Sequence, residues 1–125
     1  MDKEFVPSVE SLALKELGFD EPCLGVFREG TKMVRINDEP RNWNDNVRNG
    51  ETTSAPTFSQ AFRWFRDKHN LHAVIMSKIT PSNTTVYYIY KGKIEKDWNN
   101  CFESYEQAEL DCLRKLIEIA KAQNP

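Results

Sequence analysis

The spacing of hydrophobic residues predicts a helix near each end of the chain and one in its middle. The first helix is expected at 8–17, with Ser8 as its N-terminal cap and Gly18 as the residue that ends it. Its apolar stripe consists of Val9, Leu12, Ala13 and Leu17. The last helix follows a capping pair, Ser104 and Gln107, and has a wide apolar face over about five turns.

The middle helix lies in a segment, residues 58–72, that is rich in both aromatic rings and cations. Thr57 and Gln60 form a capping box before it. One helical stripe contains Phe58, Ala61, Phe62 and Phe65. Burying a phenylalanine is worth about 1.5 to 3 kcal/mol, so we expect these rings in the core. The residues expected off the stripe, on the solvent side, are Arg63, Arg66 and Asp67, and Trp64 falls at its border.

Two hairpins separate the helices. The first is expected within 23–36, around a Glu-Gly turn, and the second joins 71–79 to 84–90. A further short strand is possible at 93–95. Because strand side chains alternate between faces, Val86, Tyr88 and Tyr90 share one face, while Tyr87 and Ile89 share the other.

The predicted order is α-ββ-α-ββ(β)-α, which belongs to the α+β class: a small antiparallel sheet with helices packed on one face. At 125 residues the chain is expected to form a single domain, 1–125. Residues 37–56 are polar, contain two prolines and almost no apolar residues, and are expected to form a loop.

Three features of the sequence indicate where in the cell the protein is expected. No apolar run approaches the about 20 residues that cross a bilayer, and the acidic N-terminus lacks the pattern of a signal peptide. The three cysteines are widely spaced and odd in number, which favours reduced thiols. We therefore expect a cytoplasmic protein without membrane partners.

Catalytic, metal and cofactor sites are not expected. His69 and His72 are the only histidines, and two ligands at a helix-to-strand junction do not make a metal site; His69 is better explained as a charge partner of the helix C-terminus. No activated nucleophile motif or glycine-rich phosphate loop is present. The sequence predicts a protein that is not an enzyme and has no cofactor.

The basic middle of the chain is a candidate nucleic-acid surface, because residues 60–96 hold seven Lys or Arg and only two acids. Rings on a sheet beside cations can stack bases and neutralise phosphates. The candidate residues are Arg63, Arg66, Lys68, Tyr88, Tyr90, Lys91 and Lys93. The element order from residue 57 onward is similar to that of a double-stranded-RNA-binding domain, but Glu106, Glu109 and Asp111 would repel phosphate from the last helix.

The polar loop is a candidate site for a protein partner. Trp43 is its one aromatic residue, and it is either an anchor that pins the loop to the core or an exposed contact residue. With Arg41 and Arg48 it gives the loop the Trp and Arg bias of binding hot spots. An exposed Trp43 would favour a protein partner, whereas exposed Tyr88 and Tyr90 beside Lys91 would favour nucleic acid.

Three segments carry a resemblance to a known group: ALKELGFDEPC at 13–23, AFRWFRDKHNLH at 61–72 and SYEQAELDCLRKLIEIAK at 104–121. They resemble small uncharacterised proteins of bacteriophages and prophages, particularly those of gut Bacteroides and relatives. The resemblance implies a phage or prophage origin and a bacterial cytoplasm, and it implies no activity. The first hypothesis is binding of a protein, host, phage or a second copy of itself; the alternative is nucleic acid.

Overall fold

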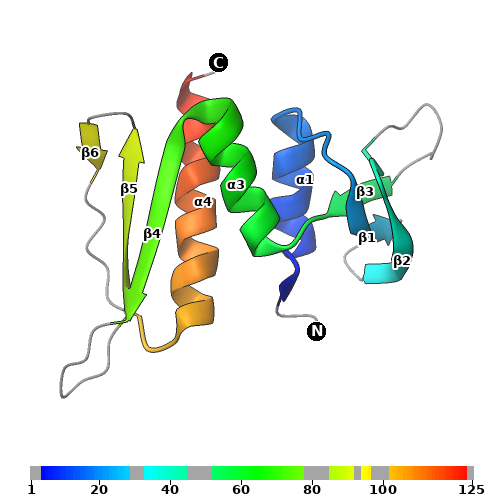
Figure 1. The fold of residues 1–125 in the computed structure, drawn as a ribbon, viewed down its shortest axis with the longest axis horizontal. Helices are drawn as coiled ribbons and strands as arrows, with labels where there is room; N and C mark the ends of the chain where they lie inside the picture. Colours follow the sequence, from blue (N-terminus) through cyan, green and yellow to red (C-terminus); the bar gives the residue numbers. More distant parts are fainter. Residues whose placement is uncertain are drawn as a thin grey trace. The chain divides into compact units, whose positions relative to one another are not determined.

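The computed structural model describes residues 4–28, 33–44, 52–77, 85–91, 94–96 and 102–123. The elements in chain order are α1 (Ser8–Glu16), β1 (Cys23–Arg28), β2 (Met33–Arg41), β3 (Thr52–Ala55), α3 (Phe58–His69), β4 (Leu71–Ser77), β5 (Thr85–Lys91), β6 (Ile94–Lys96) and α4 (Tyr105–Gln123) (Figure 1). This is the α+β class that the sequence predicts. The chain divides into two compact units, 1–61 and 62–125, and the boundary falls within α3.

The strands form two antiparallel sheets, where the sequence led us to expect one. In the first unit the order is β2-β1-β3, and in the second it is β4-β5-β6. The predicted hairpin of β1 and β2 is confirmed, with Gly25 opposite Ile36. The prediction of a loop over 37–56 is wrong at both ends, because β2 continues to Arg41 and β3 begins at Thr52. Pairing with β1 makes a strand of β3 despite its polar sequence.

Helix α1 turns a different face to the core from the one its apolar stripe predicts. Val9 is 69% exposed and Leu12 is also exposed, whereas Glu10, Ser11 and Leu14 are buried. The Ser11 hydroxyl donates to the carbonyl of Val6, 3.0 Å away, so its burial leaves no hydroxyl donor unpaired. The N-terminal cap is Pro7 and not Ser8, while Gly18 ends the helix at a φ of 95°, as predicted.

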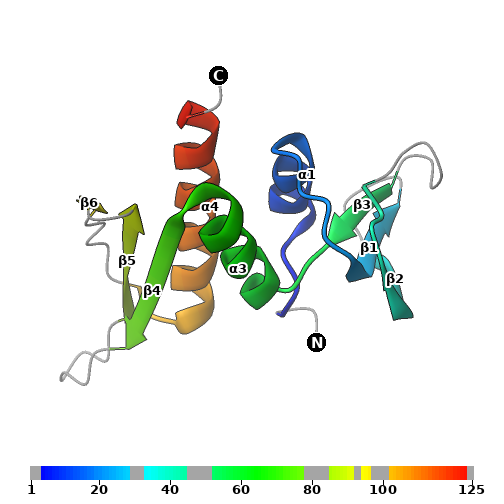
Figure 2. The ribbon, with the colours of Figure 1, turned by 45° about the horizontal axis from the view of Figure 1, so that its top comes forward.

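In the second unit α4 packs against β4 and β5, and Figure 2 shows it along one side of that sheet.

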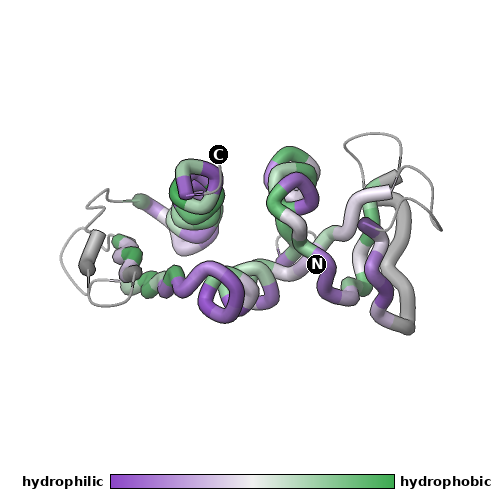
Figure 3. The backbone as a smooth tube through the Cα atoms, turned by 90° about the horizontal axis from the view of Figure 1, so that it is seen from above, coloured by the Kyte–Doolittle hydropathy of each residue, from purple (hydrophilic) through white to green (hydrophobic). Residues whose placement is uncertain are grey.

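The two predicted capping bonds are present: the Gln60 amide donates to Thr57 Oγ1 and the Gln107 amide to Ser104 Oγ, each over 3.2 Å. The buried face of α4 consists of Ala108, Cys112, Leu113, Leu116, Ile117 and Ala120. In Figure 3 hydrophilic and more hydrophobic stretches recur along α3, as its amphipathic sequence requires.

The stripe predicted for α3 is confirmed at three of its members and wrong at one. Phe58, Ala61 and Phe65 are buried, but Phe62 is only half-buried. Trp64, which the sequence placed at the border, is buried and packs edge to face on Phe65 with 5.1 Å between ring centroids. The buried face of α3 is therefore turned about the helix axis relative to the predicted stripe, so that it includes Trp64 and only part of Phe62.

Gly25 sits where β1 and β3 approach most closely, and we expect Gly25→Ala to cost about 1 to 3 kcal/mol of unfolding free energy. An alanine Cβ there would lie 2.8 Å from the carbonyl oxygen of Ala55 and 3.1 Å from the Phe5 ring. The closer atom is backbone, so the strands must separate to relieve the clash. Urea unfolding measures the loss, and an unchanged midpoint would contradict this close approach.

Candidate functional site

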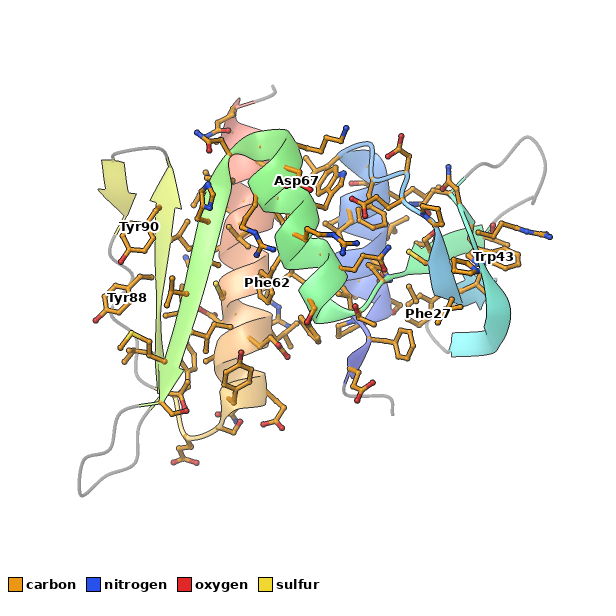
Figure 4. All side chains as sticks on the ribbon, viewed as in Figure 1. Phe27, Trp43, Phe62, Asp67, Tyr88 and Tyr90 are labelled. Carbon is orange, nitrogen blue, oxygen red and sulfur yellow. The ribbon has the colours of Figure 1, made fainter. Side chains whose placement is uncertain are left out.

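The residues predicted to bind a partner from the polar loop are not exposed as a group. Trp43 is only 3% exposed, and its Nε1–H donates to the carbonyl of Cys23 over 3.0 Å. Figure 4 places its side chain beside β1 and β2. Arg41 is exposed and holds its guanidinium over the Trp43 ring, 5.2 Å from the centroid. Arg48 lies outside the described residues. Trp43 is therefore an anchor that holds this segment to the core, and not an exposed contact residue.

Backbone contacts fix the chain around Trp43. Its amide donates to Ser54 Oγ over 2.9 Å, and the Thr52 hydroxyl donates to its carbonyl. The next residue, Asn44, accepts from the Ser54 amide and donates to the carbonyl of Phe19, each over 2.8 Å. These bonds tie the end of β2 to β3 and to the segment after α1, so the region is a structural clamp.

The predicted nucleic-acid residues separate into two groups. Arg63, Arg66 and Lys68 are exposed on α3, as expected, next to the exposed Asp67 (Figure 4). Tyr88 and Tyr90 are partly exposed on β5. Lys91 is the last residue of β5, with its side chain outside the described part, and Lys93 is not described.

One face of the second sheet is covered by α4. Tyr87 and Ile89 point to this side and are fully buried, and the Tyr87 hydroxyl donates to Asp111 Oδ2 on α4 over 2.5 Å. Burial, and then the neighbouring Asp111, raise the pKa of Tyr87, so it stays a neutral donor. Tyr87 therefore fastens the middle of β5 to α4.

The opposite face, which we call the open face, contains His72, Val74 and Met76 on β4 and Val86, Tyr88 and Tyr90 on β5. The register pairs His72 with Tyr90, Val74 with Tyr88, and Met76 with Val86, which is buried. Val74 is 42% and Met76 45% exposed. Figure 4 shows the Tyr88 and Tyr90 side chains leaving β5 on the same side.

The sequence analysis missed the contribution of β4 to this face. The signal was present, because LHAVIMS carries apolar residues at both odd and even positions. Such a strand is either covered on both faces or leaves one apolar face uncovered. On β4 and β5 the described residues of the open face include no Lys, Arg, Asp or Glu, whereas on β6 the register places Glu95 on this face, opposite Tyr90.

The two thiols in the described part of the chain are packed away from solvent. Cys23 and Cys112 are buried free thiols, and desolvation raises the pKa of Cys23 to about 12 and raises that of Cys112 as well. Such thiols are poor nucleophiles because little thiolate forms. The His69 ring packs against Trp64 with 4.8 Å between centroids, and burial lowers its pKa. His69 lies in the last turn of α3, where the sequence placed it, and its partial burial disfavours the charged form of the ring.

Within the described ranges, the structure gathers no three His, Cys, Asp or Glu side chains into a group that could hold a metal ion. Nor does any helix in the described part have the length and apolar character to cross a membrane. The fold defines a small α+β protein whose described strands form two antiparallel sheets, and the second sheet leaves Val74 and Met76 exposed on one face. No protein-family model, curated protein or solved structure matches the chain.

Proposed function

We propose that this chain is a non-enzymatic protein that acts by binding another protein through the open face, in the bacterial cytoplasm that its phage-type resemblance implies. The observation that supports this most directly is the exposure of Val74 and Met76 beside two tyrosines on one sheet face. Antiparallel sheets with one covered face usually present polar residues on the other. On this sheet the open face carries exposed Val74 and Met76 and two partly exposed tyrosines, next to the polar His72 and Glu95.

The chemistry of the open face fits a protein partner. The centres of protein interfaces are enriched in tyrosine and methionine and depleted of charge. Tyr88 and Tyr90 add large rings with hydroxyl groups, which bury apolar area while keeping a polar tip for hydrogen bonding. The earlier candidate, the surface around Trp43, is unsuited to this role because its indole is already buried.

The test uses a photo-crosslinking amino acid at Met76 and, as a control, at Glu118, which is exposed on α4. We expect host-cell extract to yield a protein crosslinked at 76 and not at 118. The captured protein is then purified, and its affinity for the chain is measured with Val74→Lys, which should weaken binding at least about tenfold, or 1.4 kcal/mol. Equal crosslinking at both positions, or unchanged affinity, would remove the open face as the site.

Nucleic acid is the second candidate, favoured by the Tyr88 and Tyr90 rings together with the exposed cations of α3. The same protein is titrated with single- and double-stranded oligonucleotides at low and physiological salt. Salt-sensitive binding that is lost with Arg63→Glu and Arg66→Glu would replace the first proposal, since phosphate contacts weaken as salt rises. Both arginines are exposed, so the charge reversal should leave the thermal melt cooperative.

A further inference from the structure

Helix α3 extends the layer that β4 and β5 form in the second unit. Figure 3 shows β5, β4 and the part of α3 after residue 62 in one row, with α4, which ends near the C label, on one side of that row. A single residue, Asn70, separates α3 from β4, and its left-handed φ of 53° lets the chain turn sharply there. The last turn of α3 therefore lies next to the first residues of β4, and the side of α3 turned away from α4 adjoins the open face.

The side of α3 that adjoins the open face carries arginine. Arg63 and Arg66 are both exposed. Figure 4 places Phe62 on the side of α3 toward β4 and Asp67, the one acid of this helix, on the other side. Successive residues of a helix are about 100° apart, so Arg66 follows Phe62 by about 40° and shares its side of the helix. Arg66 is therefore an exposed cation on the β4 side of α3, and Asp67 points away from the open face.

Charge varies across the surface that α3 and the open face form together. The register places His72 opposite Tyr90, and Tyr90 opposite Glu95 on β6. Along this row the surface is basic at α3, through Arg66, and acidic at β6. Farther along β4 the exposed Val74 carries no charge. Opposite potentials meet in a complementary interface, so a fitting partner places an acidic group over α3 and apolar groups over Val74.

We propose that the partner at the open face is a protein segment that combines apolar side chains with a carboxylate: the apolar groups cover Val74 and Met76, and Arg66 binds the carboxylate. This rests on the proposed function, since it names the chemistry of the partner at the same surface. A guanidinium is always charged and offers a fork of donors that matches a carboxylate. The phosphates of a nucleic acid would also pair with Arg66, but they offer no apolar group to Val74 and Met76. The two features together therefore favour an acidic protein segment.

The test selects a random-peptide display library on the full chain and titrates the enriched peptides, made synthetically, by fluorescence anisotropy. We expect enriched sequences that combine aromatic or aliphatic residues with Asp or Glu. Val74→Lys should weaken their binding at least about tenfold, and Arg66→Glu about three- to tenfold, as befits an exposed charge pair that is reversed. The effect of Arg66→Glu should shrink as salt rises, because salt screens exposed charges.

A control variant and a charge swap identify the role of Arg66. Arg114→Glu is the matched control, because it is the same substitution at an exposed arginine of α4, the helix that covers the other face of the sheet, and it should leave binding unchanged. A peptide whose acidic residues are replaced by lysine should bind Arg66→Glu more tightly than the unaltered protein. Arg66→Gln provides a second variant if the reversal fails to fold, and the thermal melt of each variant checks folding.

The proposal fails if no peptide is enriched, if the enriched peptides lack acidic residues, or if Arg66→Glu and Arg114→Glu weaken binding equally. Peptides that still lose binding with Val74→Lys in these cases would leave the open face standing as the site of the proposed function. Acidic peptides whose affinity is unchanged by Val74→Lys would overturn the proposed function together with this inference. Oligonucleotide binding that is lost with Arg66→Glu and kept with Val74→Lys would assign Arg66 to the second candidate.

Discussion

Replacing Trp43 with alanine is expected to lower the free energy of unfolding by about 3 to 5 kcal/mol. The indole is nearly completely buried, and it fills the first unit between the end of β2 and β1. Truncation leaves a cavity and removes the donor to the carbonyl of Cys23. Small domains are stable by about 5 to 15 kcal/mol, so the loss is a large share of the total. Thermal and urea unfolding measure it.

Two further substitutions separate the contributions of Trp43. Trp43→Phe keeps a ring but leaves the buried Cys23 carbonyl without its donor, and should cost about 1 to 3 kcal/mol. Arg41→Ala removes only an exposed cation over the ring face, worth about 0.5 to 1 kcal/mol. If Trp43→Ala melted like the unaltered protein and instead lost a binding partner, Trp43 would be a contact residue and the clamp would be wrong.

Phe65→Ala is the second substitution with a large expected effect, also about 3 to 5 kcal/mol. Phe65 has no exposed surface and packs on the rings of Trp64 and His69. Its removal leaves a cavity that neighbouring rings, already close-packed, can fill only in part. Equilibrium unfolding in urea, with the midpoint and slope both recorded, gives the change in stability.

Phe62→Ala is the matched control, because it is the same substitution in the same helix. The sequence alone predicted the full cost of a core deletion there, but Phe62 is half-buried. It should therefore cost less than Phe65→Ala by at least about 1 kcal/mol, since less apolar area is lost from contact. Equal costs at the two positions would show that the helix is rotated relative to the structure.

Local sequence patterns were sufficient to predict those elements whose ends and buried face depend on residues close together in the chain. The apolar spacing of α4, the capping bonds from Thr57 and Ser104, and the end of α1 at Gly18 all follow from residues within a few positions of one another. A wide apolar stripe over many turns leaves a helix one favourable orientation. The α+β class and the strands β4 and β5 could be predicted for the same reason.

The sequence of the short helix α1 was not enough to predict which of its faces is buried. It has only nine residues, barely more than two turns. Over so short a length, the side with Val9 and Leu12 and the side with Leu14 are both apolar enough to face the core. The chain entering the helix determined the result: the Val6 amide donates to the carbonyl of Pro56, and the Ser11 hydroxyl binds the carbonyl of Val6. These contacts join segments that no local pattern relates.

By itself the sequence determined the elements with long periodic patterns, the capping bonds from Thr57 and Ser104, and the sharing of one strand face by Tyr88 and Tyr90. Only the tertiary structure decided that Trp43 is buried, that the polar residues of β3 complete a sheet, and that α4 covers the Tyr87 side and leaves Val74 and Met76 exposed. The reason is physical: periodicity is a property of neighbouring residues, whereas burial depends on which distant segment packs against them.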